Sequence, residues 1–294
     1  FKGKSHFGEN VTFDETLPTN YLADEVIDDN KVNELLAKKY NETIVIAEDD
    51  SEILAYLKDE LSTNFRVIAV NNGYDAVKAV MDDEVSLILS DVLMPALNGF
   101  QLCSNIKSNI ATCHIPIVLL TALSDDNQRI YGIAEGADEY IHKPFNMQYV
   151  RLKIIRIIEE RKRLASTFAQ KFGRLTRHEA ANLPCVDDVF RDKLFNLIEA
   201  QHSDSNFKIE LMSDMLGMSR ILLYRKITSI FGMSPSDLLR NYRLQKAVQL
   251  LTDQRRNVSE VAYIVGFSSP AYFAKCFKSV YNMTPTEYMY RTRE

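Results

Sequence analysis

Acidic residues follow two of the apolar runs in the first half of the chain. Glu48, Asp49 and Asp50 come directly after the run at 43–47, and Asp91 comes directly after the run at 87–90. Carboxylates held within a few ångströms repel one another unless a hard cation lies between them, and oxygen ligands of this kind suit Mg²⁺. These residue types therefore predict a magnesium site beside a carboxylate that can act as a nucleophile.

Two further side chains would complete phosphoryl-transfer chemistry. Lys143 supplies a cation that can neutralise charge on the transferring oxygens, and Thr121 supplies a hydroxyl that can hydrogen-bond them. Each residue alone has an ordinary explanation: Lys143 as surface charge, Thr121 as a strand-end cap, Asp91 as the cap of the next turn. Because they all follow successive apolar runs, the set as a whole favours the chemical explanation.

Strand and helix patterns alternate through this part of the chain, and this alternation would bring the polar side chains together. Strands are expected at 43–47, 65–70, 87–90, 117–120 and 140–141, with helical stretches between them. Such alternation predicts a parallel sheet covered on both sides. The carboxyl ends of parallel strands meet at one edge, where these sheets bind ligands. We therefore predict an α/β domain with a five-stranded parallel sheet and its site at that edge.

Four segments of this domain resemble the signature segments of a response-regulator receiver domain. They are IVIAEDD, SDVLMP, TAL and GADEYIHKPF, and the resemblance covers residues 42–160. The resemblance implies a flavodoxin-like fold in which Asp91 accepts phosphate and Lys143 contacts that phosphate. It also implies that Asp49 and the backbone carbonyl of Leu93 bind Mg²⁺, and that Glu48 acts mainly through metal-bound water. Thr121 and Tyr140 would form a switch pair. The sequence departs from the pattern at Asn98, where related domains usually carry an acid, and little effect is expected.

Composition narrows the class of protein. No stretch approaches the roughly twenty apolar residues of a membrane span, and no signal-peptide pattern is present, so a cytoplasmic location is expected. The four cysteines show no CxxC pairing, which favours reduced thiols over disulfides or zinc. Residues 1–41 lack sustained periodicity and are predicted to be a mobile lead-in. Their start, FKGKSHF, resembles the end of the ATP-binding domain of hybrid sensor kinases, and a first residue other than Met indicates a fragment or a processed form.

Charge divides the chain into an acidic block and a basic block. Residues 42–150 carry 6 Lys and Arg against 17 Asp and Glu, whereas residues 151–294 carry 24 against 15. This division indicates a regulatory site followed by a polyanion binder, with a charge bias that has no function as the alternative. Residues 161–185 are predicted to be a basic connector. This connector could contact DNA phosphates or be a plain solvated linker. Before it, a helical stripe of apolar residues starting at Val150 is expected to close the first domain.

The last part of the chain, residues 186–294, is predicted to be all helix and contains an internal repeat. Aligning Ser219 with Ser269 matches a helix, a residue tolerant of left-handed geometry and a second helix start in both copies. In each copy a Ser or Thr cap is followed by Pro and, three residues after the cap, by an acid expected to complete a capping box. A shorter helix and a Gly turn precede each copy. This arrangement predicts two helix-turn-helix units.

The 3.6-residue period indicates which side chains the second helix of each unit presents. We expect Leu223 and Ile227 to face inward in the first unit, and Phe273 and Phe277 to face inward in the second. The side chains on the opposite side of each helix are then expected to face outward. The residues expected outward, or flanking the outward face, are Ile221, Tyr224, Arg225 and Thr228 in the first unit and Ala271, Tyr272, Lys275 and Lys278 in the second. Cations suit a phosphate or a guanine edge, and small apolar side chains suit a thymine methyl. The alternative is a pair of helical hairpins with solvated outer faces.

These segments also resemble a known class of DNA-binding domain. LGMSRILLYRKI, NYRLQKAVQLL, VSEVAYIVGFSSPAYFAKCFK and TPTEY are similar to the AraC/XylS class. The resemblance implies that the stretches from Arg220 to Thr228 and from Pro270 to Lys278 enter successive major grooves of double-stranded DNA, about 34 Å apart. It also implies that the helix at 235–251 braces both units.

Together these patterns predict a two-component response regulator whose phosphorylation controls dimerisation and DNA binding. The expected partners are DNA, a phosphodonor histidine kinase that is either separate or part of the same polypeptide, a second copy of the chain when phosphorylated, and RNA polymerase. Beyond its own phosphorylation and dephosphorylation, no enzymatic activity is expected of these residues. By analogy with similar fusions, the full protein would be a hybrid kinase anchored in the inner membrane that regulates nutrient or carbohydrate genes. The alternatives are a magnesium-dependent aspartyl phosphotransferase or phosphatase, and a phosphate-storing module whose helices bind a protein.

Overall fold

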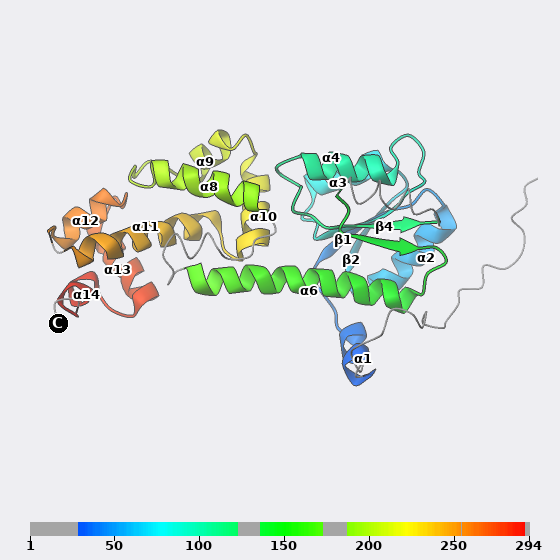
Figure 1. Cartoon of the computed structure of the whole chain (residues 1–294), viewed down its shortest axis with the longest axis horizontal. Coiled ribbons are helices and arrows are strands. Elements are labelled where there is room, and N and C mark those ends of the chain that lie inside the picture. Colours follow the sequence, from blue (N-terminus) through cyan, green and yellow to red (C-terminus); the bar gives the residue numbers. More distant parts are fainter. Residues whose placement is uncertain (1–28, 123–135, 173–186, 254, 292–294) are drawn as a thin grey trace, which may run out of the picture. The chain divides into compact units, whose positions relative to one another are not determined.

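The computed structural model describes residues 29–122, 136–172, 187–253 and 255–291. Contacts divide the chain into two compact units: Phe1–Asn109 with Ile115–Ile158, and Ile110–His114 with Glu159–Glu294. Figure 1 shows the elements of both units, and we describe each unit separately. Within the described ranges, no helix combines the length and the apolar content that crossing a membrane requires.

The first unit is built on a five-stranded sheet in which every neighbouring pair is parallel. The strands are β1 (Thr43–Ala47), β2 (Arg66–Val70), β3 (Leu87–Asp91), β4 (Ile117–Thr121) and β5 (Glu139–His142). Their order is β2-β1-β3-β4-β5, which is that of a flavodoxin-like sheet. The predicted α/β fold is therefore confirmed, and each strand lies within one residue of its predicted bounds.

Helices cover both faces of this sheet because its strand residues alternate between two cores. Ile44 and Ile46 join the core that contains α2 (Ser51–Ser62) and the first half of α6 (Met147–Phe172). Val45 and Ala47 join the core that contains α3 (Gly73–Asp82) and α4 (Gly99–Ser108). Figure 1 shows these two pairs of helices on opposite sides of the strands. Burial on both faces accounts for the continuous apolar runs in the sequence.

The end of the predicted lead-in is ordered against this unit. Helix α1 (Asp29–Ala37) carries Leu35 and Leu36, which pack against the core shared by α2 and α6. The Asn64 side chain donates hydrogen bonds of 2.8 Å to the carbonyls of Leu36 and Lys38. The prediction of a mobile lead-in over 1–41 is thus corrected for residues 29–41, since apolar contacts and side-chain hydrogen bonds hold them. The kinase-like start at residues 1–7 lies outside the described residues.

The predicted connector at 161–185 is not a separate linker where the structure describes it. Helix α6 continues without a break to Phe172, and the division between the two units falls after Ile158. Phe168 and Phe172 are buried in the core of the second unit, so residues 161–172 are folded rather than solvated. The basic composition hid these aromatic residues, whose spacing places them on one side of the helix. Residues 173–186 lie outside the described ranges.

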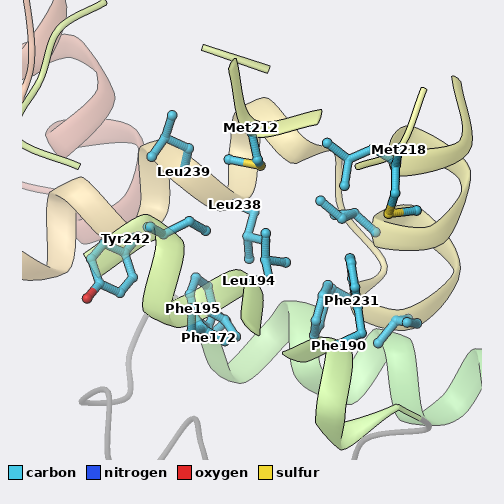
Figure 2. Packing of buried hydrophobic residues seen from close by; sticks show 14 of the residues in the cluster. Phe172, Phe190, Leu194, Phe195, Met212, Met218, Phe231, Leu238, Leu239 and Tyr242 are labelled. Atoms are coloured by element: carbon cyan, nitrogen blue, oxygen red, sulfur yellow. The ribbon is translucent and has the colours of Figure 1, made fainter. Parts of the chain in front are cut away.

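The second unit is helical, as predicted. After α6 its elements are α8 (Asp188–Gln201), α9 (Ile209–Met215), α10 (Arg220–Phe231), α11 (Pro235–Thr252), α12 (Val258–Ile264), α13 (Pro270–Tyr281) and α14 (Pro285–Arg291). The first helix-turn-helix is α9 with α10, and its core receives side chains from α6, α8 and α11. Figure 2 shows Phe172, Phe190 and Phe231 gathered there with Leu238 and Tyr242. This aromatic core fixes the position of α10.

Helix α11 serves both helix-turn-helix units. Its first half places Leu238 and Tyr242 in the core around α10. Its second half places Leu244 and Leu251 in a separate core with Phe273 and other residues of α12 and α13. The prediction that the helix at 235–251 braces the two units is therefore confirmed.

The two units repeat the same backbone geometry with one difference in the turn. Gly217 and Gly266 have positive φ and donate equivalent hydrogen bonds at the end of the shorter helix, but they are 49 residues apart, whereas the caps Ser219 and Ser269 are 50 apart. The turn of the second unit is thus one residue longer, and the predicted fifty-residue shift holds only from the caps onward. At the other end of α10 and α13, the predicted left-handed residue has a φ of 66° or 58°.

The capping boxes after these helices differ between the copies. In the second copy, Thr284 and Glu287 exchange both bonds, with Thr284 N–H to the carboxylate at 2.7 Å and Glu287 N–H to the hydroxyl at 3.2 Å. In the first copy, the Asp237 carboxylate accepts from the Ser234 hydroxyl instead. Aspartate is one methylene shorter than glutamate, so the predicted box forms only at Thr284.

Candidate functional site

The predicted acidic residues meet at the carboxyl edge of the sheet. Strands β1 and β3 are neighbours in register, with Ala47 opposite Ser90, so the next residue of each strand, Glu48 and Asp91, also face one another. Carboxylate oxygens of Glu48, Asp49 and Asp91 all lie within 4.8 Å of one another. Glu48 and Asp91 are buried and Asp49 is exposed, which leaves one side of the cluster open to solvent.

A fourth acid near the cluster has a different task. The Asp50 side chain is the N-cap of α2 and accepts hydrogen bonds from the backbone N–H groups of Glu52 at 2.9 Å and Ile53 at 3.1 Å. Its carboxylate is therefore committed to the helix end. The run of acids after β1 thus supplies two residues to the cluster and one to the fold.

Lys143 lies beside the acids and contacts two of them. Its Nζ donates to Glu48 Oε2 at 2.8 Å and lies 3.0 Å from Asp91 Oδ1. Strand β5 pairs with β4, and the backbone N–H of Lys143 donates to the carbonyl of Thr121 at 2.7 Å. This backbone bond continues the sheet by one residue and holds the lysine at the same edge as the acids.

The charges at this edge shift the titration of two groups. Burial raises the pKa of Glu48 and the charge of Asp91 adds to this effect, although the hydrogen bond from Lys143 opposes it. Burial alone would lower the pKa of Lys143, but its hydrogen bonds to Glu48 and Asp91 outweigh burial and raise that pKa. The shift of Glu48 thus follows mainly from burial, and that of Lys143 from the two acids around its ammonium group.

The donor set fits a hard divalent cation. Three carboxylates with mutually close oxygens at a partly open edge offer the oxygen ligands that Mg²⁺ prefers, with room for water. The predicted fourth ligand, the Leu93 carbonyl, belongs to the loop two residues after Asp91, and its role stays a prediction. Among the described residues, this cluster of metal-ligand side chains is the one whose ligand atoms converge.

The loop after Asp91 is shaped by two residues. A Cβ on Gly99 would lie 2.3 Å from the Asp91 carbonyl oxygen, so only glycine permits this close approach. Asn98 is the N-cap of α4 and forms a capping box with Gln101. Asn and Asp are comparable N-caps, so Asn98 can cap the helix as an acid would; that the departure has little effect stays a prediction.

The predicted switch residues lie on the adjacent strands. Thr121 is buried at the end of β4. Tyr140 pairs in register with Leu119 on β4, and its side chain packs against the core that contains α3 and α4. The Tyr140 hydroxyl oxygen is buried, so the ring points inward. Their roles in switching stay predictions.

Helix α10 presents most of the predicted DNA-contacting residues. Arg220, Ile221 and Tyr224 are exposed, and Arg225 is half-buried, while Leu223 and Ile227 face inward. Thr228 departs from the predicted outward position: it is half-buried, and its hydroxyl oxygen is buried without a hydrogen-bond partner among the described residues. Helical period predicts the side of the helix but not which neighbouring elements cover it.

Helix α13 matches its predicted face in full. Phe273 and Phe277 are completely buried. The predicted outward set is exposed throughout: Ala271, Tyr272, Lys275 and Lys278. The Ser269 hydroxyl accepts from the N–H of Tyr272 and caps the start of the helix. This face is therefore available to a large partner.

Sequence reasoning missed Lys226, a fully buried lysine of α10. Its Nζ lies 2.6 Å from Asp187 Oδ2, at the N-cap of α8, and 4.5 Å from the ring centroid of Phe190. The signal was present, because Lys226 is three residues after Leu223 and therefore belongs to the inward stripe. The equivalent position in the second unit is Cys276, which is also buried.

Comparison with known proteins supports both domains. Residues 44–155 match the model of the response regulator receiver domain, and residues 212–291 match a helix-turn-helix domain. A relative from Formosa agariphila, "Histidine kinase P4", is 37% identical over 95% of this chain and 20% of its own length. The "Transcriptional regulatory protein GltR" of Pseudomonas aeruginosa is 38% identical over 38% of this chain and 47% of its own length.

One solved structure is similar to part of the chain. The signal receiver domain of a signal transduction histidine kinase from Syntrophus aciditrophicus is 34% identical, covers 42% of this chain and 93% of its own, and has a TM-score of 0.40. The chain spans about a fifth of the first relative and about half of the second. The domain matches agree with the sheet order, the acid cluster and the two helix-turn-helix units. The chain therefore joins a response regulator receiver domain to an AraC-type helix-turn-helix domain.

Proposed function

We propose that this chain is a two-component response regulator in which phosphorylation of Asp91 controls the binding of α10 and α13 to double-stranded DNA, and thereby transcription. The main support for this proposal is that four side chains converge at one sheet edge: Glu48, Asp49, Asp91 and Lys143. The same chain also holds two helix-turn-helix units that share the helix α11. A phosphoryl-transfer site and a polyanion-binding surface in one chain favour regulation of DNA binding.

The receiver residues divide the chemistry of phosphorylation among them. An Asp91 carboxylate oxygen attacks the phosphorus of a phosphohistidine or a small phosphodonor, and the bond to the donor breaks with its electron pair leaving on the donor. Lys143 Nζ, 3.0 Å from Asp91, is positioned to neutralise the oxygens of the new acyl phosphate. Thr121, buried at the end of β4, donates its hydroxyl to one of those oxygens. Bound Mg²⁺ would supply additional positive charge at the same edge.

The switch couples this edge to the surface that bears Tyr140. Contacts between the phosphate and Thr121 favour one arrangement of β4 and β5, and the inward Tyr140 ring packs behind them. We propose that two phosphorylated receivers pair through this surface and through the start of α6. Phosphate can shift the balance between the inactive and the pairing-competent arrangement only by the difference between its interaction free energies with these two arrangements. Sedimentation with and without beryllofluoride tests the pairing, and an unchanged mass would refute it.

The helix-turn-helix units would bind successive major grooves, with α10 and α13 about 34 Å apart along one face of the duplex. The basic balance of residues 151–294 supports binding to a polyanion. A contact with RNA polymerase follows if the chain activates transcription.

The partners beyond DNA follow from the relatives. Since the chain covers a fifth of a relative named as a histidine kinase, we propose that the phosphodonor kinase belongs to the same polypeptide. That polypeptide would be anchored in the inner membrane, with the present residues on the cytoplasmic side. Its target genes would serve nutrient or carbohydrate use. Within these residues the only activity proposed is phosphorylation and dephosphorylation of Asp91.

The phosphorylation test compares two aspartates that lie close together. Asp91→Asn is nearly isosteric and should abolish uptake of label from radiolabelled acetyl phosphate in Mg²⁺. Asp50→Asn is the matched control, because Asn caps helices as well as Asp does and Asp50 bonds to α2 rather than to the cluster. Full labelling of the Asp91→Asn variant would refute the acceptor assignment. Rapid release of phosphate from small phosphate esters would instead favour a hydrolase.

The DNA test is a selection of bound duplexes from a random pool, carried out with and without beryllofluoride. A regulator of transcription should enrich a defined sequence, and should bind it more tightly in the presence of the phosphoryl mimic. Replacing Arg225 or Lys275 by Ala should weaken binding by about 1–3 kcal/mol if the side chain contacts a base. Enrichment of no sequence would refute the function.

A further inference from the structure

The two DNA-facing helices are equivalent in backbone but differ in the chemistry of their exposed faces. Helices α10 and α13 both begin after a Ser N-cap whose hydroxyl accepts from the third following N–H, and both end at a left-handed residue. Position by position they are fifty residues apart, so Ile221 corresponds to Ala271 and Arg225 to Lys275. Differences between the faces therefore reflect side chains rather than helix placement.

On α10, two of the three cations pair with acids of the protein, and the exposed face also carries large apolar side chains. Arg220 pairs with Glu210 at 3.1 Å, and Lys226 is fully buried against Asp187. Arg225 is half-buried. Beside the paired Arg220, whose side chain is 67% exposed, the exposed large side chains in the first half of the helix are Ile221, at 62%, and Tyr224, at 52%.

On α13, the exposed face carries a smaller aliphatic residue and more cations. The residue equivalent to Ile221 is the much smaller Ala271, Tyr272 is 53% exposed, as Tyr224 is on α10, and two lysines, Lys275 and Lys278, are exposed. Neither lysine forms an ion pair among the residues that the structure describes, although the charge of Lys278 adds to the Thr284 hydrogen bonds that lower the pKa of the exposed Glu287. Their ammonium groups are therefore available to an external anion.

We propose that the two helix-turn-helix units divide the recognition of DNA: α10 recognises thymine methyl groups through Ile221 and Tyr224, and α13 holds phosphates through Lys275 and Lys278. This inference rests on the proposed placement of both helices in major grooves. On the major-groove edges of base pairs, the apolar group is the C5 methyl of thymine. Ile221 is the second residue of α10, and residues at the start of such helices contact base edges.

The division has a measurable signature because the two kinds of contact respond to different variables. Apolar contact with a methyl group releases no counterions, so it adds to affinity without changing the salt dependence. Each phosphate contact through a lysine contributes about 0.9 to the slope of log affinity against log salt concentration. Base discrimination and salt dependence should therefore be separable by mutation.

The probe is the duplex selected from the random pool, synthesised with thymine and then with deoxyuridine at each thymine of one half-site. Uracil lacks only the methyl group and pairs in the same way. The 294-residue chain should bind the uracil duplex about fourfold more weakly for each contacted methyl group. Substitution in the half-site bound by α10 should have this effect, and substitution in the other half-site should have little.

Two variants complete the test. Ile221→Ala should bind the thymine and uracil duplexes of its half-site with a smaller difference in affinity than the unaltered chain, with an unchanged salt slope. Lys275→Ala combined with Lys278→Ala should reduce the slope by about 2 and keep the preference for thymine. All three side chains are exposed, so loss of folding is not expected, and far-UV circular dichroism checks this.

The outcomes separate this inference from the function on which it rests. Sequence-specific binding with equal affinity for thymine and uracil duplexes would overturn the inference and leave the DNA-binding function standing. A reduced salt slope in Ile221→Ala, or an unchanged slope in the double lysine variant, would also overturn it. Enrichment of no duplex would overturn both.

Discussion

Replacing Lys143 by Met removes the positive charge from the acid cluster and keeps the aliphatic part of the side chain. Lys143 Nζ contacts Glu48 at 2.8 Å and Asp91 at 3.0 Å, and the three side chains are 19%, 2% and 9% exposed. Removing one partner of a buried ion pair costs about 3–5 kcal/mol. Since Lys143 is partly exposed, we expect the lower end, about 3 kcal/mol, in the absence of divalent cations.

Mg²⁺ should restore much of this loss. In the variant the carboxylates lack their ammonium partner, so a cation that binds only the folded state has more repulsion to relieve. A ligand at a hundredfold excess over its Kd stabilises the folded state by about 2.7 kcal/mol. The gain on adding Mg²⁺ should therefore be larger in Lys143→Met than in the unaltered chain.

The assay must report the receiver alone, because a chain with two units does not unfold in one step. Amide hydrogen exchange of peptides from β1 and β3, read by mass spectrometry in EDTA and in Mg²⁺, gives the opening free energy of the sheet. Lys107→Met is the matched control: its side chain is also 19% exposed, and it pairs with Asp138 at 2.6 Å, outside the acid cluster. It should lose stability without any restoration by Mg²⁺. An equal Mg²⁺ gain in both variants would refute the counter-charge role of Lys143.

Three other predictions concern stability. Burial raises the pKa of Tyr281 to about 12, above its unfolded value of about 10. The stability that this residue contributes is therefore complete below pH 10 and is lost as the pH rises towards 12. At pH 11 the unaltered chain should lose about 1 kcal/mol more than Tyr281→Phe, measured on the thermal or urea transition of the second unit. A Cβ on Gly232 would lie 2.7 Å from the Ala165 carbonyl oxygen, so Gly232→Asn should destabilise the second unit by more than about 2 kcal/mol, although Asn tolerates the φ of this position. Asn282→Gly should be nearly neutral, and the thermal transition of the second unit measures both. Asn98→Ala removes a capping box and should cost about 1 kcal/mol, visible as faster hydrogen exchange at the start of α4.

The sheet and the acid cluster were predictable because local patterns determine them. A run buried on both faces is continuous in apolar residues, and a parallel sheet gathers its carboxyl ends at one edge. Glu48, Asp49, Asp91 and Lys143 needed no other information to be brought together. The sequence did not show that Asp50 caps a helix rather than binding metal. A helix cap and a metal ligand can both be aspartate, and Asp50 lies in the same run of acids as the cluster residues.

The second unit shows where local patterns end. Lys226 is inward by helical period, but its residue type suggested solvent, and only the tertiary partner Asp187 makes its burial tolerable. The prediction for Thr228 was wrong in the opposite direction: it was expected to face outward but is half-buried. The helical period alone does not reveal which elements pack beside α10. Phe168 and Phe172 lie in a basic stretch whose average charge concealed two core residues.

The residues that position α10 and α13 differ from the residues that these helices expose, so the exposed residues can vary between the two units without moving the helix. The position of α10 or α13 depends on the serine cap, the left-handed residue at its end and inward side chains such as Leu223 or Phe273. Residues 221 and 271 take no part in those interactions and are exposed in both copies. Exchanging Ile221 and Ala271 should therefore change stability by less than about 0.5 kcal/mol while moving the thymine preference from one half-site to the other. A transfer of preference accompanied by a large loss of stability would show that the exposed face also determines how the helix packs.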